Sequence, residues 1–587
     1  MTIRHNAYVC IILELMNKTS AKVTPRKKQV KSKNGTKTRR TNKERFSLFL
    51  KFFVVPALIY ASIFFILNPH HLGSFNRSFY LDSGDGFQNV WNIWWVNESI
   101  TQLHQQPYYT DFLHYPHGVS LAGQTLNIFN GLLGIVLMNV FSTSLVQATN
   151  IAVLLGFIGG GVTMFWLIQK LYKRYWISIF GGALFTFSSY HFAHGIGHLQ
   201  LISLEWIPLF MLAFITLTEK LRWRDALYAG IALVLVGLCD YYYLLYSTAF
   251  AGLWTLYKLH ARELQISWRN VRLFALFGAI VVAFLGPPIY LLLQLSESGK
   301  LLGVHDANMF SMDILSPFLP GGWWRWANLT EFFWKRLPGY YSETSVFFGY
   351  GLIALIAYAF FNKKRLNPPR WLNFWWLLFF VFGILSLGRH PRIYGHQIER
   401  IPLPYQILEA LSPTFKLSGM PVRMILMSLL SGIVIACFVL TKLDLKTRKG
   451  RIILSVLVLV TIFDLSPKSL PLSPSAEPTY IAKLRTLPPG AIIDNGATSS
   501  PNALYYQTIH ERKEAFGYIS RLPESVDNKD FEIFADLEEN RLQELCSQHG
   551  IRYVTTYKKY QTTLPVVYEE PWNAGLRIYD VKDSDRC

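Results

Sequence analysis

Long apolar runs recur along this chain of 587 residues and constrain its fold more than any other feature. Several of them exceed about 17 residues, the length that an α-helix needs to cross a bilayer. Charged residues make up only 16% of the chain, against about 25% in soluble proteins. The sequence therefore excludes a soluble globular fold and predicts a polytopic α-helical membrane protein.

Short basic loops between the apolar runs indicate how the helices are oriented. The segments 170–174, 220–224 and 363–365 are rich in Lys and Arg, and short loops of this kind stay in the cytoplasm. The net charge of +20 therefore reports membrane orientation and does not indicate a nucleic-acid partner. We predict about eleven transmembrane helices, at 46–67, 145–168, 176–192, 199–217, 226–239, 243–257, 273–295 (kinked at Pro287-Pro288), 345–361, 371–387, 422–440 and 451–465.

Residues 127–141 are also apolar enough to span a membrane. A full crossing there would place the basic loop 170–174 outside, so we predict a juxtamembrane helix in the first external loop. The basic residues 1–45 are predicted to form a disordered cytoplasmic tail. The membrane domain is then 46–465, with the N-terminus in the cytoplasm.

The composition changes after residue 465. Residues 466–478 are rich in Pro and Ser and are predicted to form a linker. Residues 479–587 are polar, with strands predicted at 491–494, 552–556 and 576–579 and a helix at 531–548. We predict a small α/β domain, which the odd number of spans places outside the cell. The five cysteines lack metal-ligand spacing, and two lie in predicted spans, which disfavours a disulfide framework.

The first external loop carries two aspartates in the stretch 81–86, Leu-Asp-Ser-Gly-Asp-Gly. Four aromatic residues, Phe87, Trp91, Trp94 and Trp95, follow at helical spacing. Because tryptophan prefers the depth of the lipid headgroups, we expect this helix in the membrane interface. A carboxylate at that depth would meet both a lipid headgroup and a substrate from the water side. The alternative is that Asp85 only caps the helix, and the local sequence favours the two roles equally.

A histidine-rich turn joins the third and fourth predicted spans. His191, His194 and His198 are spaced three and four residues apart, so one helical face would present them together. They would suit a metal cluster, a proton relay or a phosphate-binding rim. A fourth ligand in register is missing from the sequence, which makes metal the least favoured of these, and ordinary interfacial histidines are the plainer alternative.

The other candidate binding residues fall on the same external side. Glu205 is costly in lipid and should face a cavity, while Asp240 begins a tight turn that it also suits as a cap. Arginines such as Arg389 and Arg423 bind phosphate well, and aromatic rings beside carboxylates suit a sugar. We predict one external cavity, and its candidate substrate-binding residues are His117, His194, His198, Glu205, Asp240, Glu343, Arg389 and Arg423.

Several short motifs, taken in order, resemble a known superfamily. They are Gly84-Asp85-Gly86 with Trp91-Asn92 and Trp94-Trp95 behind it, and the segments 115–120, 194–199, 223–227, 505–510 and 517–521. Together they cover about 70–585 and resemble the GT-C glycosyltransferases, polytopic enzymes that use polyprenyl-phosphate sugars as donors. The resemblance is greatest to a bacterial and archaeal group of GT-C-like proteins. It implies a GT-C-like fold with juxtamembrane helices in the first external loop.

The resemblance also implies roles for particular residues. A first-loop carboxylate is the general base in that superfamily, and this role falls on Asp85 with Asp82 in reserve. Arg423 or Arg389 would stabilise the lipid phosphate as it leaves. Gly86 stands where many relatives carry a second acidic residue. The resemblance therefore leaves open whether the protein uses a divalent cation, which is the one cofactor that it suggests.

The implied activity is inverting transfer of a sugar from a polyprenyl-phosphate donor to a glycan, lipid or protein of the cell envelope. The reaction would take place at the outer face of the cytoplasmic membrane. One alternative is a non-catalytic membrane protein that binds or translocates a lipid-linked glycan, although the repeats typical of transporters are not evident in the sequence. Another is a scaffold in which Asp85 only caps its helix.

Overall fold

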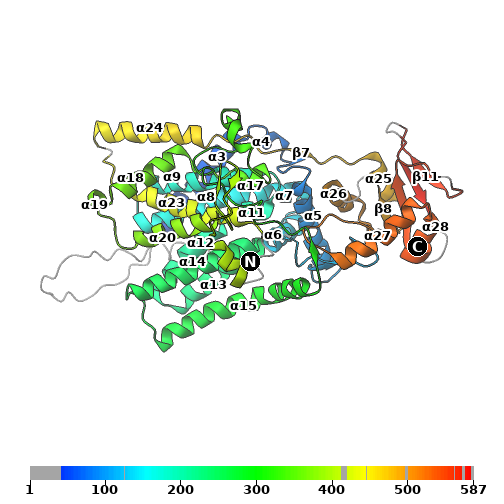
Figure 1. The fold of residues 1–587 in the computed structure, drawn as a ribbon, viewed down its shortest axis with the longest axis horizontal. Helices are drawn as coiled ribbons and strands as arrows, with labels where there is room; N and C mark the ends of the chain where they lie inside the picture. Colours follow the sequence, from blue (N-terminus) through cyan, green and yellow to red (C-terminus); the bar gives the residue numbers. More distant parts are fainter. Residues whose placement is uncertain are drawn as a thin grey trace.

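The computed structural model describes residues 41–124, 126–411, 415, 419–444, 446–495, 500–560, 562–571 and 575–582. The tail predicted at 1–45 lies outside these residues except for its last five. The molecule is elongated, with a helical body at one end and a small β-sheet near the C-terminus at the other (Figure 1).

Among the described residues, four helices are long and apolar enough to cross a membrane: Asn42–Leu67, Leu145–Tyr172, Trp268–Glu297 and Pro421–Thr441. The first comprises α2 (Asn42–Phe49), η1 (Leu50–Val54) and α3 (Val55–Leu67). The second comprises α7 (Leu145–Leu154), η3 (Leu155–Gly159) and α8 (Gly160–Tyr172). The third is α15 (Trp268–Glu297), which continues through Pro287 and Pro288, and the fourth joins η5 (Pro421–Met424) to α23 (Ile425–Thr441). The protein is therefore a membrane protein, as predicted.

Shorter helices occupy the other predicted spans. They are α9 (Tyr175–Thr186), α10 (Ser189–His194), α11 (Leu199–Ile202), α12 (Trp206–Lys220), α13 (Trp223–Cys239), α14 (Tyr241–His260), α18 (Tyr350–Phe361), α20 (Leu372–Leu385) and α24 (Arg448–Asp464). Most of these helices begin and end within a few residues of the predicted spans. They are not, however, among the helices whose length and composition suffice to cross a membrane. The number of crossings, about eleven, stays a prediction.

Local chemistry explains why these helices begin and pack where they do. Ser144 and Gln147 form a reciprocal capping box at the start of α7. Glycines let α3 approach its neighbours, because a Cβ on Gly161 would lie 2.6 Å from the Tyr60 ring. The Tyr60 hydroxyl then donates to the carbonyl of Ile179 at 3.0 Å, which satisfies a polar group inside the helical body.

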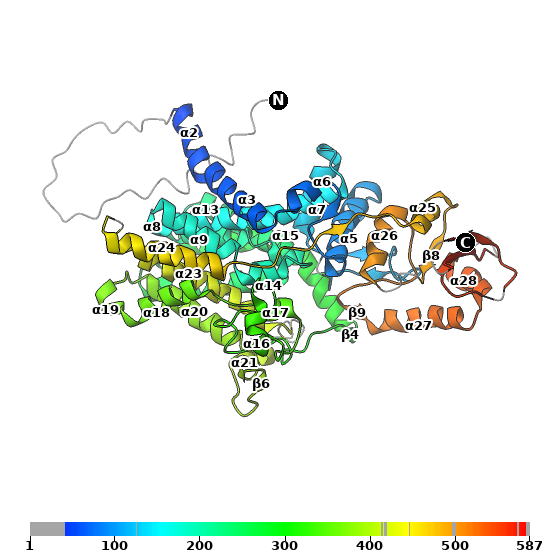
Figure 2. The same ribbon diagram turned by 90° about the horizontal axis from the view of Figure 1, so that it is seen from above.

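The loop between α3 and α7, which is predicted to be external, contains α5 (Asp85–Asn97), η2 (Glu98–Gln102) and α6 (Ile128–Val140), and α6 occupies the residues of the helix predicted at 127–141. The aromatic residues of α5 are covered by protein and not left for lipid headgroups, while the depth of α5 in the membrane stays a prediction. Trp91 and Trp95 are fully buried and stacked, with ring centroids 5.6 Å apart. The reason is a protein neighbour, since α26 (Pro501–His510) lies beside α5 (Figure 2) and Gln507 Oε1 accepts a 2.7 Å hydrogen bond from Trp91 Nε1.

The C-terminal part contains a four-stranded sheet in the order β11-β12-β10-β8. The predicted strands appear as β8 (Ala491–Asp494), β10 (Ile551–Thr556) and β12 (Arg577–Asp580), while β11 (Val566–Glu569) is not predicted. β8 runs parallel to β10, and the other pairs are antiparallel. The helices here are α25 (Thr479–Thr486), α26, α27 (Glu524–Glu538) and α28 (Leu542–His549).

One expectation about this part needs correction. The single helix predicted at 531–548 is two helices, α27 and α28, because Asn540 adopts a left-handed conformation with φ of 62° between them. Among the described cysteines, Cys546 is disulfide-bonded, whereas Cys239 and Cys437 are free and buried, and one bonded cysteine is not the framework of several bridges that the sequence disfavours.

The segment 466–478 is tied to the first loop. Its strand β7 (Ser473–Pro474) pairs with β1 (Ser78–Phe79), and the Leu470 amide donates to Asn68 Oδ1 at 2.8 Å. The remaining short elements are α4 (His71–Ser74), β2 (Tyr109–Thr110), β3 (Val119–Ser120), β4 (Leu301–Leu302), η4 (Ala327–Thr330), α16 (Glu331–Trp334), α17 (Tyr341–Thr344), α19 (Lys363–Leu366), β5 (Arg392–Ile393), β6 (His396–Gln397), α21 (Tyr405–Leu411) and β9 (Leu522–Pro523).

Candidate active site

The aspartate turn 81–86 and the histidine-rich turn after α10 are bonded to each other. The Asp82 amide donates to the Ile196 carbonyl at 2.7 Å, and Asn89 Nδ2 donates to the Gly197 carbonyl at 2.8 Å. A Cβ on Gly197 would lie 2.7 Å from Asp82 Oδ1 and 2.8 Å from the Gly86 nitrogen. Only glycine therefore allows the two turns to come this close.

The two aspartates of the first loop have different structural roles. Asp82 Oδ1 accepts hydrogen bonds from the amides of Gly84 at 3.2 Å and Gly86 at 2.9 Å, so it supports the start of α5. Asp85 is the first residue of α5, and Gly84 occupies the cap position. The hypothesis that Asp85 caps this helix is therefore wrong. Burial raises the pKa of Asp82 above its ordinary value.

Asp85 is held between a histidine and a tyrosine. Its Oδ2 lies 3.2 Å from His198 Nε2, and its Oδ1 accepts a 2.9 Å hydrogen bond from the Tyr518 hydroxyl. The hydrogen bond from His198 lowers the pKa of Asp85, and the bond from Tyr518 adds to this against the opposing effect of burial. Of Asp82 and Asp85, Asp85 is thus the one whose surroundings favour the charged form.

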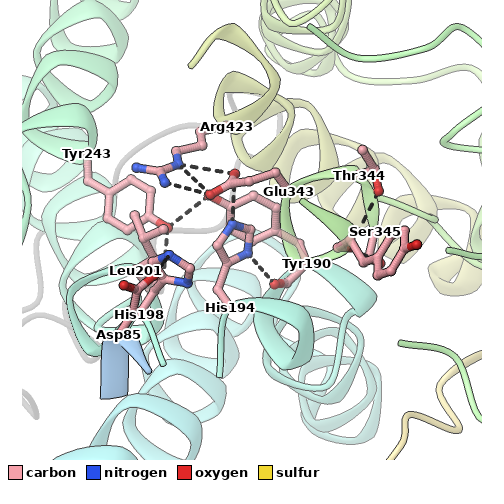
Figure 3. A network of polar contacts seen from close by, with 11 residues as sticks. Asp85, Tyr190, His194, His198, Leu201, Tyr243, Glu343, Thr344, Ser345 and Arg423 are labelled. Atoms are coloured by element: carbon pink, nitrogen blue, oxygen red, sulfur yellow. Dashed lines mark hydrogen bonds and ion pairs between the residues drawn. The ribbon is translucent and has the colours of Figure 1, made fainter. Parts of the chain in front are cut away.

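A buried ionic network lies beside this pair (Figure 3). Arg423 Nη2 donates to Glu343 Oε1 at 2.6 Å, and His194 Nε2 lies 3.1 Å from Glu343 Oε2. Burial raises the pKa of Glu343, but the attraction of Arg423 and His194 outweighs it and holds that pKa well below 4.5. The Arg423 guanidinium also lies 4.9 Å from the centre of the Tyr242 ring.

A cavity of about 360 Å³ joins these groups. Five predicted site residues line it: Asp85, His198, Asp240, Glu343 and Arg423. Burial raises the pKa of Asp240 to about 6, although this carboxylate also accepts the Tyr243 amide as the cap of α14. Helices α13, α14 and α15 also contribute an apolar wall to the lining, which is formed by Leu238, Leu245, Leu285, Pro288 and Leu292. The site therefore combines charged groups with an apolar surface on predicted membrane helices.

The other predicted site residues lie outside the lining of this cavity. His194 stands behind Glu343, and Asp82 supports the turn before α5. His117 lies in the turn before β3, where its carbonyl accepts the Tyr109 hydroxyl at 3.1 Å. Glu205 is buried at the start of α12 against Gly159. Arg389 pairs with Glu409 through two bonds of 2.6 and 3.0 Å, which leaves Arg423 as the predicted arginine that faces the cavity.

Sequence reasoning missed several lining residues. Tyr518 and Arg521 come from the C-terminal part, and His305 and Tyr340 come from the long loop after α15. Burial lowers the pKa of His305 to about 4, so this ring is neutral at pH 7. The motif at 517–521 indicates that this segment is functional, but no local sequence pattern links Tyr518 to Asp85, which lies 433 residues earlier.

Within the described ranges, groups of three or more His, Cys, Asp or Glu that would hold a metal ion are absent.

The architecture is similar to that of solved membrane glycosyltransferases. The arabinofuranosyltransferase AftD from Mycobacteria is 13% identical, with a TM-score of 0.53 over 91% of this chain and 40% of AftD. A mutant of AftD is 12% identical, with a TM-score of 0.57 over 91% of this chain and 42% of that one. The oligosaccharyltransferase AglB from Archaeoglobus fulgidus is 12% identical, with a TM-score of 0.43 over 86% of this chain and 69% of AglB.

The chain spans about 40% of the length of AftD. At this identity the likeness shows the fold alone, and that fold is GT-C-like, as the sequence motifs imply. Comparison with curated proteins finds no sequence match. A family model, the domain of unknown function DUF6311, matches residues 57–466, which is most of the chain. The protein therefore belongs to the DUF6311 family.

Proposed function

We propose that this protein is a glycosyltransferase that moves a sugar from a polyprenyl-phosphate donor to a cell-envelope acceptor. The observation that carries the proposal is the single cavity that Asp85 and Arg423 share with an apolar wall. The polar side suits a sugar and a phosphate, and the apolar side suits an isoprenoid chain. The fold shared with an arabinofuranosyltransferase supports the same class of reaction.

In the proposed reaction Asp85 is the general base. An acceptor hydroxyl loses its proton to the Asp85 carboxylate while its oxygen attacks the anomeric carbon of the donor. The bond between that carbon and the phosphate oxygen breaks, and its electron pair leaves with the polyprenyl phosphate. Attack from the face opposite the phosphate inverts the configuration at the anomeric carbon.

The surroundings of Asp85 fit this role. Its carboxylate is charged near neutral pH, which is the form that accepts a proton, and the lowered pKa makes it a weaker base than an ordinary aspartate. Its side chain is 37% exposed in the lining of the cavity, which leaves room for an acceptor hydroxyl. Arg423 supplies the positive charge that stabilises the departing phosphate, although it shares this charge with Glu343.

The apolar wall supports a lipid-linked donor. α15 contributes Leu285, Pro288 and Leu292 to the cavity, and most of the helix is exposed and apolar. An isoprenoid chain could therefore run from the cavity along α15 into the bilayer. Its apolar surface would stay out of water along this path, which is favourable.

The proposed location is the cytoplasmic membrane, with the cavity and residues 479–587 on the outer side. Short basic loops between the predicted spans support this orientation. The disulfide at Cys546 also supports it, because disulfides persist in oxidising compartments. In this arrangement 46–465 is the membrane domain, 466–478 is the linker and 479–587 is an external α/β domain that meets the acceptor.

The proposal is tested by following radiolabelled sugar from a panel of polyprenyl-phosphate donors in membranes that contain the full chain. Asp85→Asn should lower transfer by about 10²–10⁴-fold, while Asp111→Asn should leave it unchanged. Asp111 is a matched control because it lies in the same loop and pairs with Lys513 away from the cavity. Binding of a lipid-linked glycan without transfer, in a protein that is folded and inserted, would contradict catalysis and favour the carrier alternative.

A further inference from the structure

A short segment of the C-terminal part, Tyr518 to Arg521, lines the cavity. Tyr518, Ser520 and Arg521 line it together with the groups of the membrane domain. This segment lies beyond residues 57–466, where the family model matches. The cavity is therefore completed by a part of the chain that the family model does not include.

The segment is fixed on two sides by the first external loop. Gln88 Nε2 of α5 lies 3.4 Å from the Tyr518 carbonyl, and the Ser520 amide donates to Gln124 Oε1 at 2.7 Å. Gly123 permits this approach, because a Cβ there would lie 3.0 Å from the Cβ of Arg521. The position of Tyr518 relative to α5 is thus determined by contacts on both sides of it.

The loop after α15 fixes the other end of the segment. β9 pairs with β4, with Leu301 opposite Pro523 and Leu302 opposite Leu522. Arg521 Nη1 donates to the Gly303 carbonyl at 2.8 Å and to the Ser520 carbonyl at 2.9 Å. The segment is therefore held between the first external loop and the end of α15, and it cannot move without disturbing both.

Within this frame the Tyr518 hydroxyl reaches Asp85. It donates to Oδ1 at 2.9 Å, while His198 engages the other carboxylate oxygen at 3.2 Å. Two partners on two oxygens fix both the position and the rotation of the carboxylate. The groups that act on the charge of Asp85 are His198, Tyr518, Arg423 and Asp82, with burial acting against it.

We propose that Tyr518 is a positioning residue of the active site, which holds the Asp85 carboxylate toward the acceptor from the C-terminal part of the chain. The proposal rests on the proposed function for the role of Asp85. It adds that the C-terminal part is a component of the catalytic cavity and not only a surface that meets the acceptor. Burial raises the pKa of Tyr518, and the charge of Asp85 raises it further, so the hydroxyl keeps its proton and donates.

The test is Tyr518→Phe in the full-length protein, which removes one hydroxyl and keeps the ring. Loss of this hydrogen bond frees the Asp85 carboxylate to rotate, and because a misplacement of about 1 Å can cost about a hundredfold in rate, kcat should fall by about tenfold to a hundredfold. The pH at which transfer falls to half on the acid side should rise by about one unit, because the Asp85 pKa rises when a donor is lost. A purely structural role would lower activity equally at every pH. Tyr557→Phe, an exposed tyrosine of the same part, is the control and should change neither value.

A second measurement does not depend on activity. Infrared difference spectroscopy, with Asp85→Asn subtracted, follows protonation of the Asp85 carboxyl in the purified protein. The midpoint should lie about one pH unit higher in Tyr518→Phe than in the unchanged protein. An unchanged midpoint together with an unchanged pH profile would overturn the positioning role. A shifted midpoint in a protein that transfers no sugar would overturn the proposed function and leave the positioning role standing.

Discussion

Replacing Arg423 by Met separates the contribution of this residue to the stability of the protein from its contribution to sugar transfer. Arg423 is 5% exposed and contacts Glu343 through three nitrogen–oxygen pairs, at 2.6, 3.2 and 3.2 Å. Removing one partner of a buried ion pair leaves the other charge uncompensated, at a cost of about 3–5 kcal/mol. Arg423→Met should therefore destabilise the protein by that amount and abolish transfer.

The double variant Arg423→Met with Glu343→Leu removes both charges at once. Buried ion pairs replaced by apolar groups of similar volume are often neutral in stability. The double variant should therefore recover most of the loss in unfolding temperature, while transfer stays abolished because the cation at the phosphate is missing. Thermal unfolding in detergent and the transfer assay measure the two quantities separately. A double variant that is no more stable than Arg423→Met, or one that transfers sugar, would refute this reasoning.

Three further predictions concern the same site. Gly197→Ala should lower transfer by at least about tenfold and cost about 1–3 kcal/mol in unfolding free energy, because the new Cβ meets Asp82 and Gly86. Because the pKa of Glu343 is lowered in the folded protein, its charge adds to the free energy of unfolding. This contribution is fully present above pH 4.5, the ordinary pKa of the group, and is lost as the pH falls below that value. The unfolding temperature should fall on acidification in the unchanged protein and less so in Glu343→Gln. His198→Gln should shift the acid side of the pH profile of transfer upward, because its hydrogen bond is the main cause of the low Asp85 pKa.

The positions of the helices along the chain can be predicted from the sequence, because the thickness of a bilayer sets the length of the apolar run that crosses it. Most of the helices lie within a few residues of the predicted spans, and the predicted helix at 127–141 is found as α6. The strands at 491–494 and 552–556 are also found, since short β-branched runs between polar segments indicate strands. These are all local patterns.

The environment of α5 could not be predicted in the same way. Its tryptophans have the spacing of an interfacial helix, but α26, more than 400 residues later, covers them. The choice between Arg389 and Arg423 also depended on distant partners, because Glu409 engages the first and the cavity receives the second. Tyr518 was missed for this reason too. A sequence pattern shows which groups are available, but not which distant segment will pack against them.

The most direct test of the account is single-turnover release of polyprenyl phosphate from a labelled donor by the purified full chain in a lipid nanodisc. The unchanged protein should release polyprenyl phosphate at the same rate as glycosylated acceptor forms. Asp85→Asn should slow both by about 10²–10⁴-fold while the protein still binds the donor, which is the contribution expected of a general base. Release by Asp85→Asn at the rate of the unchanged protein would show that Asp85 is not the general base.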